Sequence, residues 1–281
     1  MDSTKINFKN IPVQAGIISE IIKLEVDSNN CFKELDDLIS SDQGVASLVL
    51  RVVNSPFYSR GNKVSTIPFA ISLLGYNVVR SLALLAFSRS LFSHTRNEQF
   101  RLHIWQHSLL TAIASQTISQ EWGESRLSDE AFIAGLMHDT GKVLMFNHNP
   151  ALYQQVFEHA FVNNCSSVEA EHHYFGFDHC QVGAEAVKEW KLPEHFRDYM
   201  GTDLTLAQVA PQQDTVISCL RAANYLVKAA GIGGNEIDDG ELKQAALLGF
   251  GLSSALCANL LQEGFVERLM ENETYKLCAS I

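Results

Sequence analysis

Helical periodicity is the feature that most limits the fold of this 281-residue chain. Apolar residues recur at three- and four-residue steps, as one face of an α-helix requires, and Phe32, Leu35, Leu38 and Ile39 are a clear example. Alternation of apolar and polar residues, which is typical of strands, never extends beyond a few positions. The sequence therefore predicts an all-α fold without internal repeats.

Caps and breakers predict several helix boundaries. Ser128 is a good N-cap, because two acidic residues follow it in the first turn of the expected helix. Asp178 begins a pattern that resembles a capping box, and the helix it starts is broken at Lys191-Leu-Pro193. The last helix is expected to run from Ser254 to about Lys276.

The charge of the chain is negative and unevenly distributed. Its 21 basic and 32 acidic residues give a net charge of −11, of which residues 1–100 contribute +1, residues 101–200 contribute −7 and the remainder −5. This charge would repel phosphate, so nucleic acid is not an expected partner. The cations of the near-neutral first third could form a patch, but we interpret them as ordinary scattered surface charges. They are Arg51, Arg60, Lys63, Arg80 and Arg89.

Targeting signals are not found in the sequence. Met1 to Asn10 is polar and has no apolar region of a secretion signal. The longest uncharged apolar stretch, Ala245–Leu261, is too short and too polar for a spanning helix. The six cysteines are scattered and form no Cys-x-x-Cys pair, which is typical of reduced thiols. We therefore expect a cytoplasmic protein that does not enter a membrane.

The segment from Gly135 to Lys142 could carry chemistry. It reads Gly-Leu-Met-His138-Asp139-Thr-Gly141-Lys142, and an adjacent His–Asp pair at a helix end can present both side chains to one cation. Imidazole and carboxylate together suit Zn, Fe or Mn. Gly141 is expected to free the backbone for a turn, and Lys142 could reach a phosphate oxygen. Alone, such a pair also fits a surface ion pair or a helix cap.

Histidines gather in the same part of the chain, with nine of the ten lying between His94 and His179. His103 and His107 are four residues apart and share one helix face. His172 and His173 are adjacent, so they cannot both face inward on one helix. Three histidines have no partner at a useful spacing and are expected on solvated faces: His94, His148 and His159.

Several short segments before and after the His–Asp pair occur in the same order in one protein family. Segments from the N-terminal part of the chain belong to the same series. These segments are Asp42, Leu50-Arg51-Val-Val-Asn54-Ser55-Pro-Phe-Tyr58, Ile67-x-x-Ala70-Ile71-x-x-Leu74-Gly75, Trp105-x-His107-Ser108, Gly135-Leu-x-His138-Asp139-x-Gly141-Lys142, Glu171, Gly176-x-Asp178-His179-x-x-Val182-Gly183 and Trp190-x-Leu-Pro193. Together they resemble the HD-related output domain (HDOD), a relative of the HD phosphohydrolases, and the resemblance covers roughly residues 12–230.

The resemblance implies an all-helical fold of two lobes within one unit, residues 1–281. An N-terminal helical bundle would cover residues 12–95, and a degenerate HD-like half with C-terminal helices would cover residues 96–281. The resemblance also implies a bacterial signal-transduction output or scaffold module. Members of this family are generally regarded as lacking the complete catalytic set of true HD hydrolases.

The hydrolase pattern needs a first His, then His-Asp, then a distant Asp, and His107, His138 and Asp139 match the first three. Asn224 stands where the distant Asp is expected, so a neutral carbonyl replaces a charged ligand. HD hydrolases that hold two metal ions have further histidines between the His-Asp pair and the distant Asp. His179 matches the first of these histidines. The pair of histidines usual after the Trp-x-Leu-Pro segment is missing.

Two interpretations of this centre stay open. His107, His138, Asp139 and His179 could form a weak mononuclear site for Zn, Fe, Mn or Mg. Alternatively, the same residues could be a polar cluster that only hydrogen-bonds neighbouring helix ends. In either case the second metal ion of a two-metal hydrolase would be missing. One ion alone cannot hold both the attacking and the leaving oxygen of the hydrolysis.

We therefore expect a non-catalytic signalling module. Its partners would be signalling proteins supplied by other chains, with the near-neutral lobe as the better candidate surface, or a small nucleotide ligand. The alternative is a metal-dependent phosphohydrolase that acts on a nucleotide or a cyclic dinucleotide.

Overall fold

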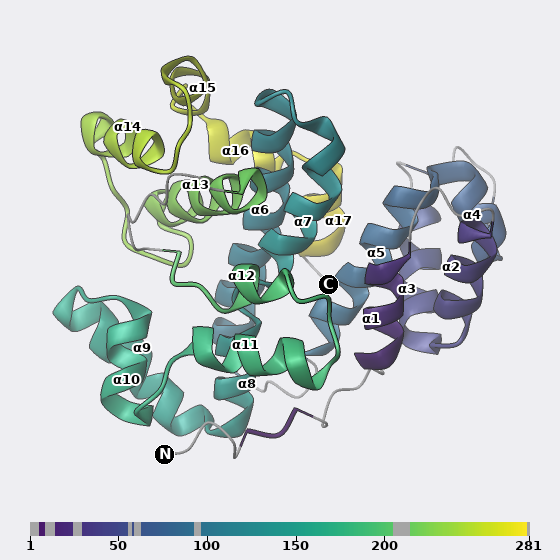
Figure 1. The fold of residues 1–281 in the computed structure, drawn as a ribbon, viewed down its shortest axis with the longest axis horizontal. Coiled ribbons are helices and arrows are strands. Elements are labelled where there is room, and N and C mark those ends of the chain that lie inside the picture. Colours follow the sequence, from purple (N-terminus) through teal and green to yellow (C-terminus); the bar gives the residue numbers. More distant parts are fainter. Residues whose placement is uncertain are drawn as a thin grey trace. The chain divides into compact units, whose positions relative to one another are not determined.

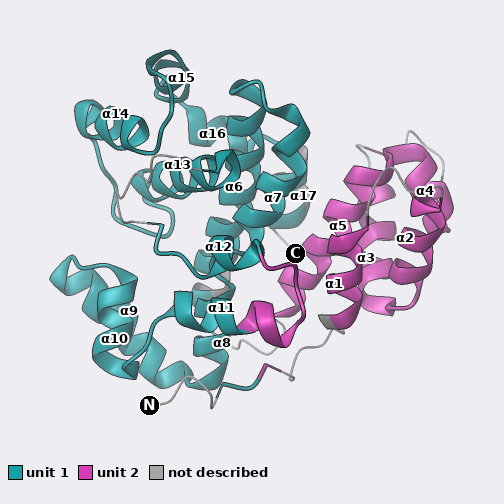
Figure 2. Ribbon diagram, viewed as in Figure 1, with its two compact units in different colours: residues 1–7, 95–185, 195–281 teal, residues 8–94, 186–194 magenta. Residues whose placement is uncertain are grey.

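The computed structural model describes residues 6–8, 15–24, 30–55, 58, 63–92, 97–204 and 214–279. Within these ranges every regular element is a helix and no strand occurs, which confirms the predicted all-α class. His94, Pro56 and Arg60 lie outside the described residues. The chain divides into two compact units (Figure 2): residues 1–7, 95–185 and 195–281 form unit 1, and residues 8–94 and 186–194 form unit 2.

Unit 2 is a small helical bundle. Asp42 caps one of its helices by accepting from the backbone N–H groups of Gly44 and Val45. Asn54 exchanges two hydrogen bonds with the backbone of Val64, which ties the end of that helix to the start of the next. The helices are α1 (Ala15–Lys23), α2 (Cys31–Ser40), α3 (Gln43–Val53), α4 (Ile67–Leu74) and α5 (Tyr76–Ser90).

A distant segment, residues 186–194, belongs to unit 2 as well. The indole of Trp190 packs edge-on against Phe87, with ring centroids 5.5 Å apart, and its N–H donates to the carbonyl of Phe8. Ser19 and Lys23 both donate to the carbonyl of Lys191. Burial of two aromatic rings and these hydrogen bonds fix the segment to the bundle.

Unit 1 is built around the long helix α6 (Glu98–Glu121), against which α7 (Ser128–Met137) and α13 (Thr215–Ala229) pack (Figure 1). The face of α6 toward these helices is apolar and buried, and Leu109, Ala112 and Ile113 are at most 2% exposed. The other helices that line or support the site are α8 (Thr140–His148), α9 (Pro150–Asn163), α10 (Ser167–Phe175), α11 (His179–Glu189) and α12 (Phe196–Met200).

Two predicted helix boundaries are wrong. Ser128 is not the N-cap of α7 but its first residue, because the 3₁₀ turn Ser125–Leu127 (η2) runs directly into the helix and Ser128 Oγ donates to the carbonyl of Ser125. The single helix expected from Ser254 is three, because Gly264, with a positive φ of 78°, interrupts it once and a turn at residues 271–272 interrupts it again. The C-terminal helices are α14 (Gly240–Gly249), α15 (Ser254–Leu260), α16 (Phe265–Met270) and α17 (Glu273–Ala279).

The described helices include none that combines the length and apolar character needed to cross a bilayer. All six cysteines are free thiols, and all except Cys165 are buried. The five buried cysteines therefore act as small apolar side chains of the core.

Candidate metal centre

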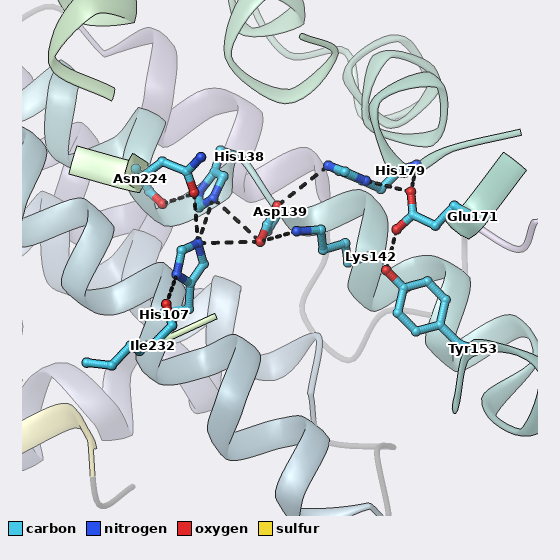
Figure 3. A network of polar contacts seen from close by, with 10 residues as sticks. His107, His138, Asp139, Lys142, Tyr153, Glu171, His179, Asn224 and Ile232 are labelled. Atoms are coloured by element: carbon cyan, nitrogen blue, oxygen red, sulfur yellow. Dashed lines mark hydrogen bonds and ion pairs between the residues drawn. The ribbon is translucent and has the colours of Figure 1, made fainter. Parts of the chain in front are cut away.

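Three side chains from two places in the chain converge in the core of unit 1 (Figure 3). His107 comes from the middle of α6, while His138 and Asp139 occupy the junction where α7 ends and α8 begins. Their exposed fractions are only 1%, 4% and 2%. One ligand atom from each lies within 4.8 Å of the others, so this cluster could hold a metal ion.

Backbone carbonyls fix the tautomer of both imidazoles. His107 Nδ1 lies 3.0 Å from the carbonyl oxygen of Ile232, and His138 Nδ1 lies 2.8 Å from that of Gly135. A carbonyl only accepts, so each Nδ1 carries the proton and donates it. Each Nε2 of the neutral ring then presents a lone pair to the centre of the cluster. A metal-ligating histidine is normally oriented in this way.

Burial also keeps both rings neutral. It lowers the pKa of His138 to about 4 and that of His107 well below its ordinary value, against the opposing charge of Asp139. Near neutral pH both Nε2 atoms are therefore unprotonated. Metal ions bind only the unprotonated imidazole, so the pair is ready for an ion without first losing protons.

Asn224 on α13 adds a fourth polar atom. Its Oδ1 lies 3.1 Å from His107 Nε2, while the two Nε2 atoms of His107 and His138 are 3.3 Å apart. Asp139 Oδ2 is 3.7 Å from the former and 3.5 Å from the latter. Three lone-pair atoms, from His138, Asp139 and Asn224, thus lie within 3.7 Å of Nε2 of His107. Such a donor set of imidazole, carboxylate and amide oxygen fits a divalent transition metal such as Zn, Fe or Mn.

The carboxylate of Asp139 also has two cationic neighbours. Lys142 Nζ donates to Oδ2 over 2.9 Å, and His179 Nε2 lies 3.7 Å from Oδ1. Although burial raises the pKa of Asp139, the surrounding histidines and Lys142 hold it well below its usual range. Burial alone would lower the pKa of Lys142, but Asp139 raises it. Both partners are therefore charged at neutral pH.

His179 is held as a cation by Glu171. Its Nδ1 and its backbone N–H both donate to Glu171 Oε2, over 2.6 and 2.8 Å. Burial would lower the pKa of this ring, yet the charge of Glu171 raises it to about 10. Tyr153 completes the arrangement by donating its hydroxyl to Glu171 Oε1 over 2.5 Å. The fully buried Glu171 is thus satisfied on both oxygens.

Two glycines allow backbone segments to approach the cluster closely. A Cβ on Gly141 would lie 2.0 Å from the carbonyl oxygen of His179, so only glycine lets α8 approach α11 this closely. The turn lies at His138 and Asp139, before α8, so Gly141 provides space inside the helix and does not form the turn as expected. Gly233 has φ of +81°, and its Cβ would lie 2.5 Å from His107 Nδ1. This close approach brings the Ile232 carbonyl to the ring.

An open hollow of about 330 Å³, counted with the solvent at its mouth, lies beside the cluster. His138, Asp139 and Asn224 form part of its wall. Lys228, one turn after Asn224 on α13, also lines it, although no sequence motif marks this residue. Only its spacing of four residues from Asn224 could have indicated a shared helix face. The remaining lining residues are Lys142, Ser166, Ser167, Val168, His179, Thr202, Asp203 and Leu204.

The remaining histidines that the structure describes stay outside the cluster. His172 Nε2 pairs with Asp178 Oδ2 at 2.7 Å, and this pair is partly exposed. His159 stacks on His173 with ring centroids 4.9 Å apart. His103 and His148 are exposed, as expected for His148. Of the four residues predicted as ligands, three meet directly, and His179 reaches Asp139 from the side that Lys142 also occupies.

Solved structures with this fold come from several bacteria. A protein of unknown function from Geobacter sulfurreducens, described as an HDOD domain protein, is 24% identical and covers 93% of this chain and 92% of its own, with a TM-score of 0.75. A Marinobacter aquaeolei protein described as a "putative signal transduction protein" is 20% identical, covers 96% and 60%, and gives a TM-score of 0.72. A Shewanella amazonensis "putative phosphohydrolase" is 20% identical, covers 97% and 95%, and gives 0.68.

One curated relative, an uncharacterised protein from Treponema pallidum, is 21% identical over 213 residues. The match covers 75% of this chain but only 41% of that protein, so the chain spans less than half of the relative's length. The family model of the HDOD domain matches residues 11–203, which include His107, His138, Asp139 and His179. The chain therefore belongs to the HDOD family.

Proposed function

We propose that this chain is a cytoplasmic signal-transduction module whose HD-like centre binds one divalent metal ion and does not turn over phosphoesters. The observation that carries the proposal is the mutual approach of the ligand atoms of His107, His138 and Asp139 in a buried site, with Oδ1 of Asn224 beside Nε2 of His107. Without a cation or a donated proton, these atoms repel one another. A bound ion removes that repulsion and ties α6, α7 and α13 together.

The ligand set favours a single ion. Two-metal hydrolysis places its ions about 3.5–4 Å apart, commonly with a shared carboxylate. Here the ammonium of Lys142 contacts Oδ2 of Asp139, and the charged ring of His179 lies near Oδ1. A second divalent ion beside that carboxylate would meet two positive charges in a buried site, which is strongly unfavourable.

Asn224 weakens hydrolysis further. A bound ion would act as a Lewis acid and lower the pKa of a water molecule. Asn224 offers only a neutral amide oxygen, where a carboxylate would both strengthen ion binding and orient that water. The role that remains for the centre is to hold the helices and a ligand in a defined arrangement.

Protein partners from other chains would then transmit the signal. Unit 2 offers a surface for them, because several of its large apolar side chains are exposed, among them Phe32 at 57%, Phe69 at 47% and Leu73 at 40%. Contiguous apolar residues on a soluble protein often mark interaction sites.

The second candidate is a metal-dependent phosphohydrolase acting on a nucleotide or cyclic dinucleotide. It is favoured by the retained His–His–Asp cluster, which opens on a hollow that a phosphoester could enter. If this alternative holds, the protein loaded with Mn, Fe or Zn should cleave members of a phosphoester panel, and His138→Ala should abolish the cleavage.

Metal analysis of protein purified without chelators tests the proposal. We expect about one transition-metal ion per chain in the wild type, little in His138→Ala, and an unchanged content in the control His148→Ala, which alters an exposed histidine. Release of phosphate should be absent in all three. A wild type that stays metal-free after incubation with Zn, Mn and Fe would refute the metal-binding part, and turnover would favour the hydrolase.

A further inference from the structure

Lys228 is a charged residue of the hollow whose position the metal centre does not explain. Its side chain is half-buried on α13, and its ammonium forms no hydrogen bond or ion pair with any residue that the structure describes. The adjoining segment 205–213 contains no acidic residue, so it supplies no carboxylate partner. Burial lowers the pKa of Lys228 to about 8, which leaves the ammonium largely charged at neutral pH.

A cation kept in such a place costs free energy unless an anion joins it. The other cations of the hollow are already used, since Lys142 bonds to Asp139 and the ring of His179 bonds to Glu171. Asp203 lines the same hollow, but it lies beyond ion-pair distance of Lys228, whose pKa it raises only through its charge. Among the residues that the structure describes, the ammonium of Lys228 therefore has no hydrogen-bond or ion-pair partner in the hollow.

Hydroxyl groups complete the wall of this space. Ser167 and Thr202 line it, and Ser167 is the first residue of α10. Ser166 also lines the hollow, but its side chain is engaged in the capping box of α10 with Glu169. Hydroxyl donors and an ammonium are the groups that bind phosphoryl oxygens in proteins. A carboxylate or a sulfate monoester carries one negative charge, whereas a phosphate monoester dianion carries two.

We propose that the hollow binds the phosphoryl group of a small phosphate monoester, held by Lys228 beside the wall that His138, Asp139 and Asn224 form. This inference rests on the proposed function only in that a bound ion would add a second contact to the same group. Lys228 is then the specificity-determining residue of the hollow, and Lys142 remains the partner of Asp139.

Isothermal titration calorimetry with adenosine 5′-monophosphate, adenosine and inorganic phosphate tests this inference. The wild type should bind the monophosphate and not adenosine, because the two differ only in the phosphoryl group. Lys228→Gln should weaken binding of the monophosphate about 10- to 100-fold, which corresponds to loss of one charge-assisted hydrogen bond. Lys228→Arg should retain most of the affinity, and the control Lys243→Gln, on α14, should bind like the wild type.

The outcomes separate this inference from the metal proposal. Equal binding by the wild type and Lys228→Gln, or no binding of the monophosphate by the wild type, would overturn the phosphoryl site whatever the metal content. Binding that depends on Lys228 in metal-free protein would support the phosphoryl site while the metal proposal fails. Inorganic phosphate binding as tightly as the monophosphate would support the phosphoryl site and identify free phosphate as a sufficient ligand.

Discussion

The Nε2 atoms of His107 and His138 lie 3.3 Å apart although each ring donates its Nδ1 proton to a backbone carbonyl. Two neutral nitrogen lone pairs at this distance repel unless a proton or an ion lies between them. Since burial holds the pKa of both rings low, protonation is disfavoured. An ion bound between these two nitrogen atoms would remove their repulsion, so metal binding at this pair can be tested directly.

Asn224→Asp should tighten metal binding at least about tenfold, because a full charge would replace an amide dipole beside the ion. Without metal the same variant should be less stable than the wild type, since a second carboxylate would then face Asp139. Calorimetric titration with Zn or Mn and thermal unfolding measure the two effects. An unchanged metal affinity would contradict the assignment, because it would mean that residue 224 does not contact the ion.

Acid should destabilise the metal-free protein through His138. The pKa of its ring is about 4 when folded and about 6.5 when unfolded, so the unfolded chain binds more protons between these values. The contribution of neutral His138 to the free energy of unfolding is therefore complete above pH 6.5. It falls by about 3 kcal/mol as the pH is lowered to 4. Urea unfolding at several pH values measures this loss. His138→Asn should flatten the dependence, and an equally steep curve in that variant would contradict the assignment.

Gly141→Ala should destabilise unit 1 by at least about 3 kcal/mol, because the added methyl group would overlap the carbonyl of His179 and force α8 away from α11. Gly249→Ala is the matched control, since nothing lies within 4 Å of its Cβ at the end of α14. Thermal unfolding of both variants decides the matter. Similar melting temperatures for the two would show that α8 and α11 can separate at little cost.

Tyr153→Phe should cost about 1–3 kcal/mol, because it removes one hydrogen bond from the buried carboxylate of Glu171 and leaves that oxygen unsatisfied. The metal content should stay unchanged, as Tyr153 touches none of the four ligand atoms. Urea unfolding and metal analysis of the same preparation give both values. If the variant lost metal while its stability stayed unchanged, Tyr153 would support the metal site and not the fold, which contradicts this prediction.

Much of this architecture could be predicted from the sequence, because helical periodicity and helix breakers act locally. The position of Asn224 beside His107 followed from the order of motifs, and the structure brings the two residues together. The role of Gly141 could not be predicted, since it depends on α11, which is remote in sequence. Lys228 was missed for the same reason: nothing near it in sequence shows that its ammonium faces a hollow built from four other segments.

The most direct test of the central claim is a crystal structure of the protein grown with Zn or Mn, with anomalous diffraction measured at the metal edge. The account predicts one anomalous peak per chain, within about 2.0–2.3 Å of the Nε2 atoms of His107 and His138 and of Asp139 Oδ2. Lys142 and His179 should keep their contacts with Asp139. The absence of any peak there, or a second peak that displaces Lys142, would contradict the account.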